Sequence, residues 1–133
     1  MFLRALRGEE KALGPDHPNT LGVAYNLGLL YLSKRRFTAA EEMLLRALRG
    51  YDKTMGAEEI STYRPAINAT LNMGILLWEQ GKPLEALPYY QRAHCNLEGL
   101  LGSTHEDVQK LREEMAKLQE EMVELSKAER KKQ

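Results

Sequence analysis

Cysteine is almost absent from this chain: Cys95 is the only one, so no disulfide can form within the chain. Excess charge is absent too, because 19 basic residues balance 19 acidic ones and the formal net charge is zero. Such a chain has no field that would attract nucleic acid or an anionic membrane. It also lacks an apolar run of about 18 residues, the length that a membrane-spanning helix needs. We therefore expect a cytoplasmic protein with neither nucleic acid nor membrane as its partner.

Residue patterns typical of catalysis or metal binding are also missing. The three histidines, His17, His94 and His105, have no second ligand at a metal-binding spacing. Cys95 follows His94, but adjacent residues on a helix point about 100° apart and do not form a nucleophile–base pair. The glycines form no phosphate-binding fingerprint. We expect no enzyme, no cofactor and no metal, and we place Cys95 in the core or in the wall of a groove.

The most informative feature that is present is an internal repeat. The hexapeptide LRALRG occupies residues 3–8 and returns unchanged at residues 45–50, an offset of 42 residues. A period of this size is typical of arrays of helical hairpins. A second pair of strings, at residues 26–31 and 72–77, is followed at identical spacings by alanines, namely Ala40 and Ala47 after the first and Ala86 and Ala93 after the second.

Glycine stands at the same place in both strings, as Gly28 and Gly74. Inside a helix, glycine is about 1 kcal/mol less favourable than alanine. The simplest reason to use it twice is the close approach of a neighbouring helix backbone. The repeated alanines then serve the facing helix at the same crossing. The pattern predicts an all-α fold of stacked antiparallel helix hairpins.

Apolar periodicity and caps predict where the helices lie. We expect helices over residues 19–34, 38–54, 63–80, from Pro83 onward, and 105–131. Four residues inserted within 57–65 predict a longer loop or an extra helical turn. Pro88 should bend its helix or loosen its first turns.

The expected units are residues 1–13, the second half of a truncated repeat; 14–56 and 57–103, two complete repeats; and 104–133, a capping helix with a frayed end. For the first segment, a natural start at Met1 is the alternative.

The C-terminal segment has a heptad pattern rather than a repeat. Its apolar residues alternate spacings of three and four: Val108, Leu111, Met115, Leu118, Met122 and Leu125. One interpretation is a capping helix that covers the last repeat. The other is that residues 115–125 pair with another chain as a coiled coil. Only about two and a half heptads are available, too few for stable pairing alone, so capping is favoured.

These landmarks resemble the tetratricopeptide repeat. Leu27-Gly28-x2-Tyr31 and Ala40-x3-Leu44 match its pattern in the first copy, and Met73-Gly74 and Ala86-x3-Tyr90 match it in the second. The usual tryptophan is replaced by Ala24 and Thr70, and Leu77 replaces the tyrosine. The 42-residue period and the linker LGPDHPNT at 13–20 look more narrowly like the kinesin-light-chain type. Arrays of that type also form C-terminal regions of NTPase immune-type receptors.

The resemblance implies a right-handed superhelix in which the first helix of each hairpin lines a concave groove. The heptad segment adds a long C-terminal helix to this superhelix. The implied groove residues are Tyr25, Asn26, Leu29, Ser33, Asn68, Asn72, Ile75 and Glu79. In the family, the asparagine before the leucine–glycine pair commonly binds a peptide backbone, and here those positions are Asn26 and Asn72. The alternative is that each amide bonds a neighbouring helix or water. Trp78 is interpreted as packing.

The implied function is protein–protein interaction, with a peptide or a partner surface bound in the groove. Capture of a peptide C-terminus is not expected, since Tyr25 and Leu29 stand where the carboxylate-binding subclass wants lysine or asparagine. The alternative function is a structural scaffold segment. Such a segment would stack on further repeats or form a homodimer through its exposed repeat end or its C-terminal helix.

Overall fold

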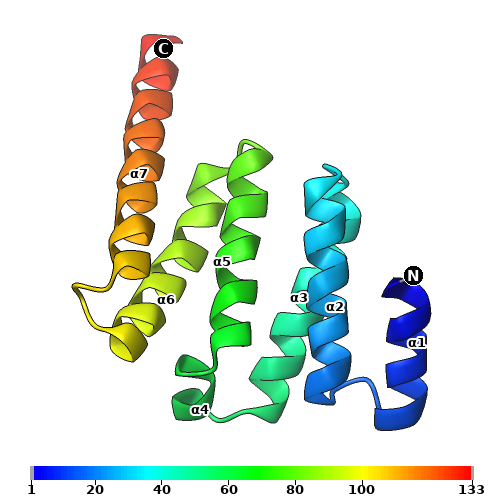
Figure 1. Ribbon diagram of the computed structural model, residues 1–133. Helices are drawn as coiled ribbons and strands as arrows, with labels where there is room; N and C mark the ends of the chain where they lie inside the picture. Colours follow the sequence, from blue (N-terminus) through cyan, green and yellow to red (C-terminus); the bar gives the residue numbers. More distant parts are fainter. Residues whose placement is uncertain (1, 133) are drawn as a thin grey trace.

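The computed structural model describes residues 2–132, and this part of the chain is built from helices alone (Figure 1). In chain order these are α1 (Phe2–Leu13), α2 (Pro18–Ser33), α3 (Phe37–Thr54), α4 (Ala57–Ser61), α5 (Arg64–Glu79), α6 (Pro83–Leu101) and α7 (Glu106–Lys132). The predicted helices agree with the observed ones to within one residue at nearly every end. None of the described helices combines the length and the apolar character needed to cross a bilayer.

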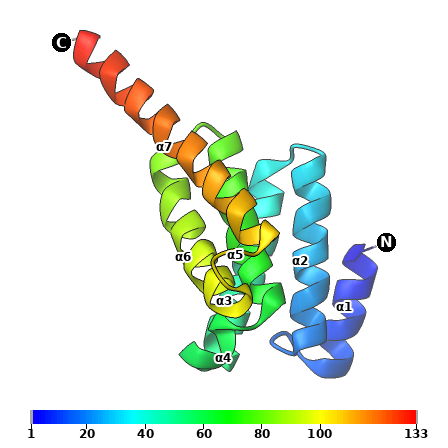
Figure 2. The same cartoon turned by 60° about the vertical axis from the view of Figure 1, so that its left-hand side comes forward.

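The helices pair as antiparallel hairpins that stack side by side (Figures 1 and 2). Helix α2 packs on α3, and α5 packs on α6. Contacts between α3 and α5 join the two hairpins, while α1 covers α2 at one end and α7 covers α6 at the other. The described residues therefore form an all-α solenoid with a long C-terminal helix.

The segment that contains the four additional residues forms the five-residue helix α4, which is the extra helical turn of the two expected alternatives. Gly56 ends the preceding segment and stands at the N-cap of α4. Ile60 anchors this extra turn, being the one α4 residue that is buried. The insertion is thus accommodated between the two hairpins, after α3 and before α5.

Of the two effects expected of Pro88, a bend in α6 or looser first turns, the loosening does not occur. Helix α6 begins at Pro83 and runs unbroken to Leu101 with Pro88 inside it. Pro88 itself is exposed, and Leu84, whose carbonyl loses its helical partner to the proline, is 74% exposed. Water can therefore satisfy that carbonyl, which makes the missing hydrogen bond tolerable.

Small residues bring the two helices of each hairpin into close contact, as predicted. A Cβ at Gly28 would lie 2.9 Å from Leu44 Cδ2 and 3.3 Å from the backbone nitrogen of Leu44. A Cβ at Gly74 would lie 2.8 Å from Tyr90 Cδ2. The glycines thus make room mainly for a large side chain of the facing helix, whereas we expected its backbone to be the close neighbour. The four alanines are all fully buried at these crossings: Ala40, Ala47, Ala86 and Ala93.

The repeated hexapeptide lies in two different environments. In α3, Ala47 is fully buried and a Cβ at Gly50 would lie 2.3 Å from Leu21 Cδ2. In α1, the equivalent Ala5 is exposed, and nothing lies within 4 Å of a Cβ at Gly8. The difference arises because α2 covers this face of α3, whereas no described helix covers the same face of α1.

This contrast predicts opposite effects for the same substitution at two equivalent glycines. Gly8→Ala should raise the free energy of unfolding by about 0.5–1 kcal/mol, because alanine is the better helix former. Gly50→Ala should lower it by about 1–3 kcal/mol, since Leu21 has no room to move away. Urea denaturation of both variants measures the difference. Equal stability of the two variants would contradict the packing described for α2 and α3.

Caps and ion pairs repeat along with the hairpins. The imidazole Nδ1 of His17 accepts the backbone N–H of Asn19 at 3.1 Å, and Nδ1 of His105 accepts that of Asp107 at 3.1 Å. The junctions between hairpins also match: Arg46 pairs with Glu10, and Arg92 pairs with Asp52. Exposed ion pairs of this kind contribute little stability. Their recurrence shows instead that successive junctions have the same geometry.

Helix α7 caps the solenoid through the first part of its heptad seam. Val108, Leu111 and Leu118 are buried in the same core cluster as α5 and α6. The end that we expected to be frayed is helical through Lys132, while Gln133 lies outside the described residues. Basic residues in the last turn oppose the negative end of the helix dipole, which favours this extension.

Tyr51 is the large aromatic residue at the junction between α3 and α5. It is fully buried and meets Tyr63 edge-on, with ring centroids 5.4 Å apart. Burial, helped by the neighbouring phenols of Tyr63 and Tyr25, raises the pKa of Tyr51 from 10.0 to about 12. The folded protein therefore keeps this proton at pH values where the unfolded chain releases it.

Stability should consequently fall as the pH rises from about 10 to about 12, by at most about 1.4 kcal/mol per pH unit for this one group. The sign follows because the unfolded chain binds fewer protons than the folded one in that range. Tyr51→Phe should make the alkaline decline shallower. Urea unfolding at several alkaline pH values tests this, and an unchanged slope in the variant would contradict the raised pKa.

Candidate functional site

The face formed by α2, α5 and α7 carries the residues predicted to bind a partner. Each of these helices is the one that follows an inter-hairpin linker. None of the eight predicted residues is buried: Asn26, Ser33 and Glu79 are exposed, and Tyr25, Leu29, Asn68, Asn72 and Ile75 are half-buried. All eight side chains are therefore accessible, and the geometry around them decides what they can do.

Tyr25, Asn68 and Asn72 form a cluster between α2 and α5. The amide Nδ2 of Asn72 donates to the phenol oxygen of Tyr25 at 3.1 Å and to the carbonyl oxygen of Asn68 at 2.9 Å. Both donor hydrogens of this amide are thus engaged, and Oδ1 is left as its acceptor. Asn26, in contrast, makes no side-chain hydrogen bond with residues that the structure describes. The two asparagines are therefore not equivalent.

The hydrogen bond from Asn72 also affects the ionisation of Tyr25. Burial raises the pKa of Tyr25, and the bond from Asn72 opposes this by stabilising the phenolate. Asn72→Ala should therefore raise the pKa of Tyr25 further. Alkaline titration of ring-labelled tyrosines by NMR measures the shift, with Asn26→Ala as the matched control that leaves this pKa unchanged. A Tyr25 pKa that stays the same or falls in Asn72→Ala would show that the bond is not formed.

A cavity of about 460 Å³ opens beside this cluster, between α5 and α7. Its lining residues are Ile75, Trp78 and Glu79 of α5, Tyr90 of α6, and Glu114 and Lys117 of α7. The indole of Trp78 packs edge-on against Tyr90, with ring centroids 5.8 Å apart. Its Nε1–H donates to the carboxylate of Glu121 on α7. Trp78 thus combines packing with a position in the cavity wall.

Carboxylates outnumber cations around this cavity. Glu79 and Glu114 line the cavity, and Glu121 lies beside it, where it accepts the hydrogen bond from Trp78. The only cationic group among the lining residues is the ammonium of Lys117. The same field is felt by the buried phenol of Tyr90: burial raises its pKa, and Glu114 and Glu79 raise it further. The cavity therefore offers an apolar floor and an acidic rim, which suits an apolar side chain next to a basic one.

The contribution of α7 was missed by the sequence analysis, although a signal for it exists. The histidine caps at His17 and His105 are equivalent, and they lie 88 residues apart. The same offset carries three predicted groove residues, Asn26, Leu29 and Ser33, onto Glu114, Lys117 and Glu121. Helix α7 therefore takes the place of the first helix of a further hairpin, in addition to capping α6.

The position of Cys95 also differs from our expectation. It is exposed, so it does not lie in the core, and it is not among the residues that line the cavity between α5 and α7. Ala93 and Leu97, which stand two positions before and two after Cys95, are both buried residues of α6. A residue midway between two inward positions of a helix points away from the core, which explains the exposure.

Stacked antiparallel hairpins with an accessible face on their first helices define a helical-repeat protein. Comparison with family models specifies the repeat: models described as tetratricopeptide repeat match residues 1–53 and 67–107. The chain therefore contains tetratricopeptide repeats, a class that generally mediates protein–protein interactions and is generally non-catalytic. The gap between the two matches contains α4, the inserted turn.

Comparison with solved structures points the same way. The crystal structure of BtubC (BKLC) from P. vanneervenii, a kinesin-light-chain-like tetratricopeptide-repeat protein, superposes with a TM-score of 0.75 at 16% sequence identity. The match covers 96% of this chain and 50% of that one, so this chain spans half the length of BtubC. At this identity the likeness concerns the fold. No curated protein matches this chain.

Proposed function

We propose that this chain binds an extended peptide or a loop of a partner protein along the face of α2, α5 and α7. The single observation that carries the proposal is the cavity between α5 and α7, with Trp78 and Ile75 as apolar walls and Glu79 and Glu114 as charges. The repeat family supports it, since tetratricopeptide repeats generally bind proteins.

The chemistry of the cavity favours a basic peptide. An aliphatic or aromatic side chain would fill the space over Ile75 and Trp78, and an adjacent Lys or Arg would pair with Glu79 or Glu114. Further along the face, the exposed amide of Asn26 can donate to and accept from one peptide unit, and Oδ1 of Asn72 can accept a peptide N–H. Anchoring at the cavity and backbone pairing at the amides would together fix the register of the peptide.

Selection from a peptide library displayed on phage tests this directly. Enriched peptides should carry Lys or Arg next to an apolar residue. Synthetic versions should change the emission of Trp78, which is the only tryptophan of the chain and therefore reports on the cavity. Glu114→Lys should weaken their binding at least about tenfold at low salt, because it reverses a charge in the wall.

Glu42→Lys is the matched control, since Glu42 is an exposed residue of α3, outside the proposed face. Its binding should equal that of the wild type. If no peptide is enriched, or if enriched peptides bind Glu114→Lys as well as the wild type, the proposed site is wrong.

Substitution of the two asparagines distinguishes an effect on peptide binding from an effect on stability. Asn26→Ala should weaken peptide binding by about 1 kcal/mol and leave the melting temperature nearly unchanged, because its amide has no partner within the described fold. Asn72→Ala should weaken binding and also lower the free energy of unfolding by about 1 kcal/mol, since it removes two hydrogen bonds. Peptide titration and urea denaturation measure the two effects. Undiminished binding by both variants would contradict an amide clamp.

A further inference from the structure

The distal half of α7 leaves the body of the molecule. Leu118 is its last buried residue, and beyond it only Met122 is even half-buried. Figures 1 and 2 both show this end of α7, in orange and red, extending past the other helices. An isolated helical segment of this length is only marginally stable in water. A packing partner would therefore stabilise it.

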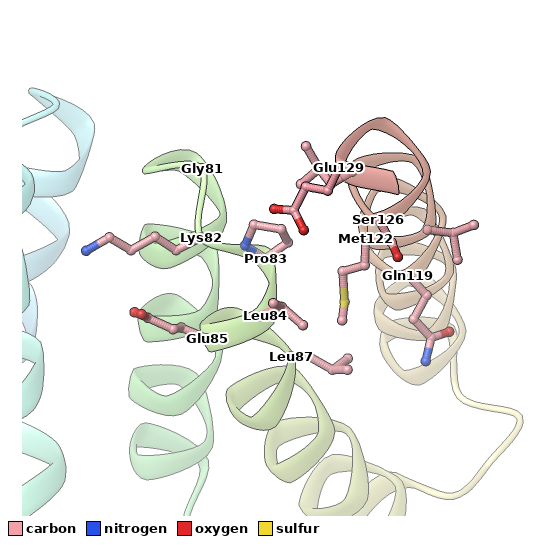
Figure 3. Close-up of a pocket in the computed structure, with 12 residues that line it drawn as sticks. Gly81, Lys82, Pro83, Leu84, Glu85, Leu87, Gln119, Met122, Ser126 and Glu129 are labelled. Carbon is pink, nitrogen blue, oxygen red and sulfur yellow. The ribbon is translucent and has the colours of Figure 1, made fainter. Parts of the chain in front are cut away.

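An open wedge of about 900 Å³ separates this free end from the start of α6. Its apolar walls are Pro83, Leu84 and Leu87 of α6 and Met122, Val123 and Leu125 of α7. Figure 3 shows Leu84, Leu87 and Met122 pointing into the gap, while Lys82 and Glu85 point away from α7.

Exposed large apolar side chains concentrate at this wedge. Leu84 is 74% exposed, Val123 51% and Leu125 48%. They are three of the six large exposed hydrophobic residues among those described, although the wedge involves only the ends of two helices. A cluster of this kind marks a surface that another protein surface covers.

The charges on α7 indicate which surface that is. Residues 113–124 carry five glutamates and one lysine, whereas residues 127–132 carry four basic residues and one glutamate. A second α7 laid antiparallel would place its basic end beside the acidic stretch, and a parallel one would place like charges together. We propose that the wedge is filled by the α7 helix of a second copy of this chain, in an antiparallel pair.

Such a pair is closed and self-complementary. The free end of each α7 enters the wedge of the other copy, so one two-fold axis satisfies both wedges and growth stops at the dimer. An axis beside Ser126 lays residues 119–124 of one copy, which include three glutamates, alongside residues 127–132 of the other, which include four basic residues.

The dimer surface and the peptide cavity lie on different faces of α7. Glu114, Lys117 and Glu121 are directed to α5, whereas Gln119, Met122 and Ser126 line the wedge beside α6. Dimerisation therefore neither requires nor blocks the proposed peptide site, and each proposal can fail without the other.

Sedimentation equilibrium of the full chain over a range of concentrations tests the dimer. The wild type should be dimeric, and Leu84→Lys combined with Val123→Lys should raise the dissociation constant at least tenfold. Both residues are exposed, so circular dichroism should show an unchanged fold. Leu13→Lys, at an exposed leucine of α1, should leave the dimer intact. A wild type that stays monomeric, or a dimer that survives the double substitution, would overturn the proposal.

Cross-linking tests the orientation, with Cys95→Ser as the background because Cys95 is exposed. Ser126→Cys lies beside the axis and should give a disulfide-linked dimer on oxidation. Gln119→Cys lies on the same face but about 20 Å from its copy in an antiparallel pair, too far for a disulfide, so it should stay uncross-linked. Cross-linking of both variants would indicate a parallel pair, and cross-linking of neither would indicate a different interface.

Discussion

Close contact between a helical glycine and one large side chain of the facing helix is the constraint on which this structure depends. Leu44 lies against Gly28, and Tyr90 lies against Gly74, at matching places in the two hairpins. Both partners are themselves buried, so neither can withdraw if the glycine acquires a side chain. The separation of the helices, and through it the stacking of one hairpin on the next, follows from these contacts. The recurring ion pairs outside the core accompany this geometry and do not create it.

Helix α7 has two roles, and each role belongs to residues on a different face of the helix. Its buried seam, including Val108 and Leu111, closes the core over α6. Another face brings Glu114 and Lys117 to the cavity that begins on α5. A terminal helix of a repeat array is required only to cover an apolar end. Here it also supplies two of the three charged residues that line the candidate site, so the cap and the binding face share one element.

The helices and the contacts within a hairpin were predictable because each depends on residues close in the pattern. The period placed Gly28 and Gly74 at crossings, and the caps placed helix ends to within about a residue. The candidate site was predictable only in part, because it depends on how separate helices meet. No local pattern shows that Asn72 reaches Tyr25 across the junction, or that α7 brings Glu114 beside Glu79. The heptad of α7 indicated an apolar seam but not which surface would cover it.

The short helix α4 has a consequence for how this architecture can change. Four additional residues entered one junction, yet the ion pair across it, Arg92 with Asp52, matches the pair of Arg46 with Glu10 at the junction without them. Apart from Ile60, the residues of this turn are surface residues. The linker thus accommodates additional residues without a change in this contact between the hairpins, as an exposed insertion point does. A tag or a small reporter domain grafted between Ala57 and Glu59 would exploit the same tolerance.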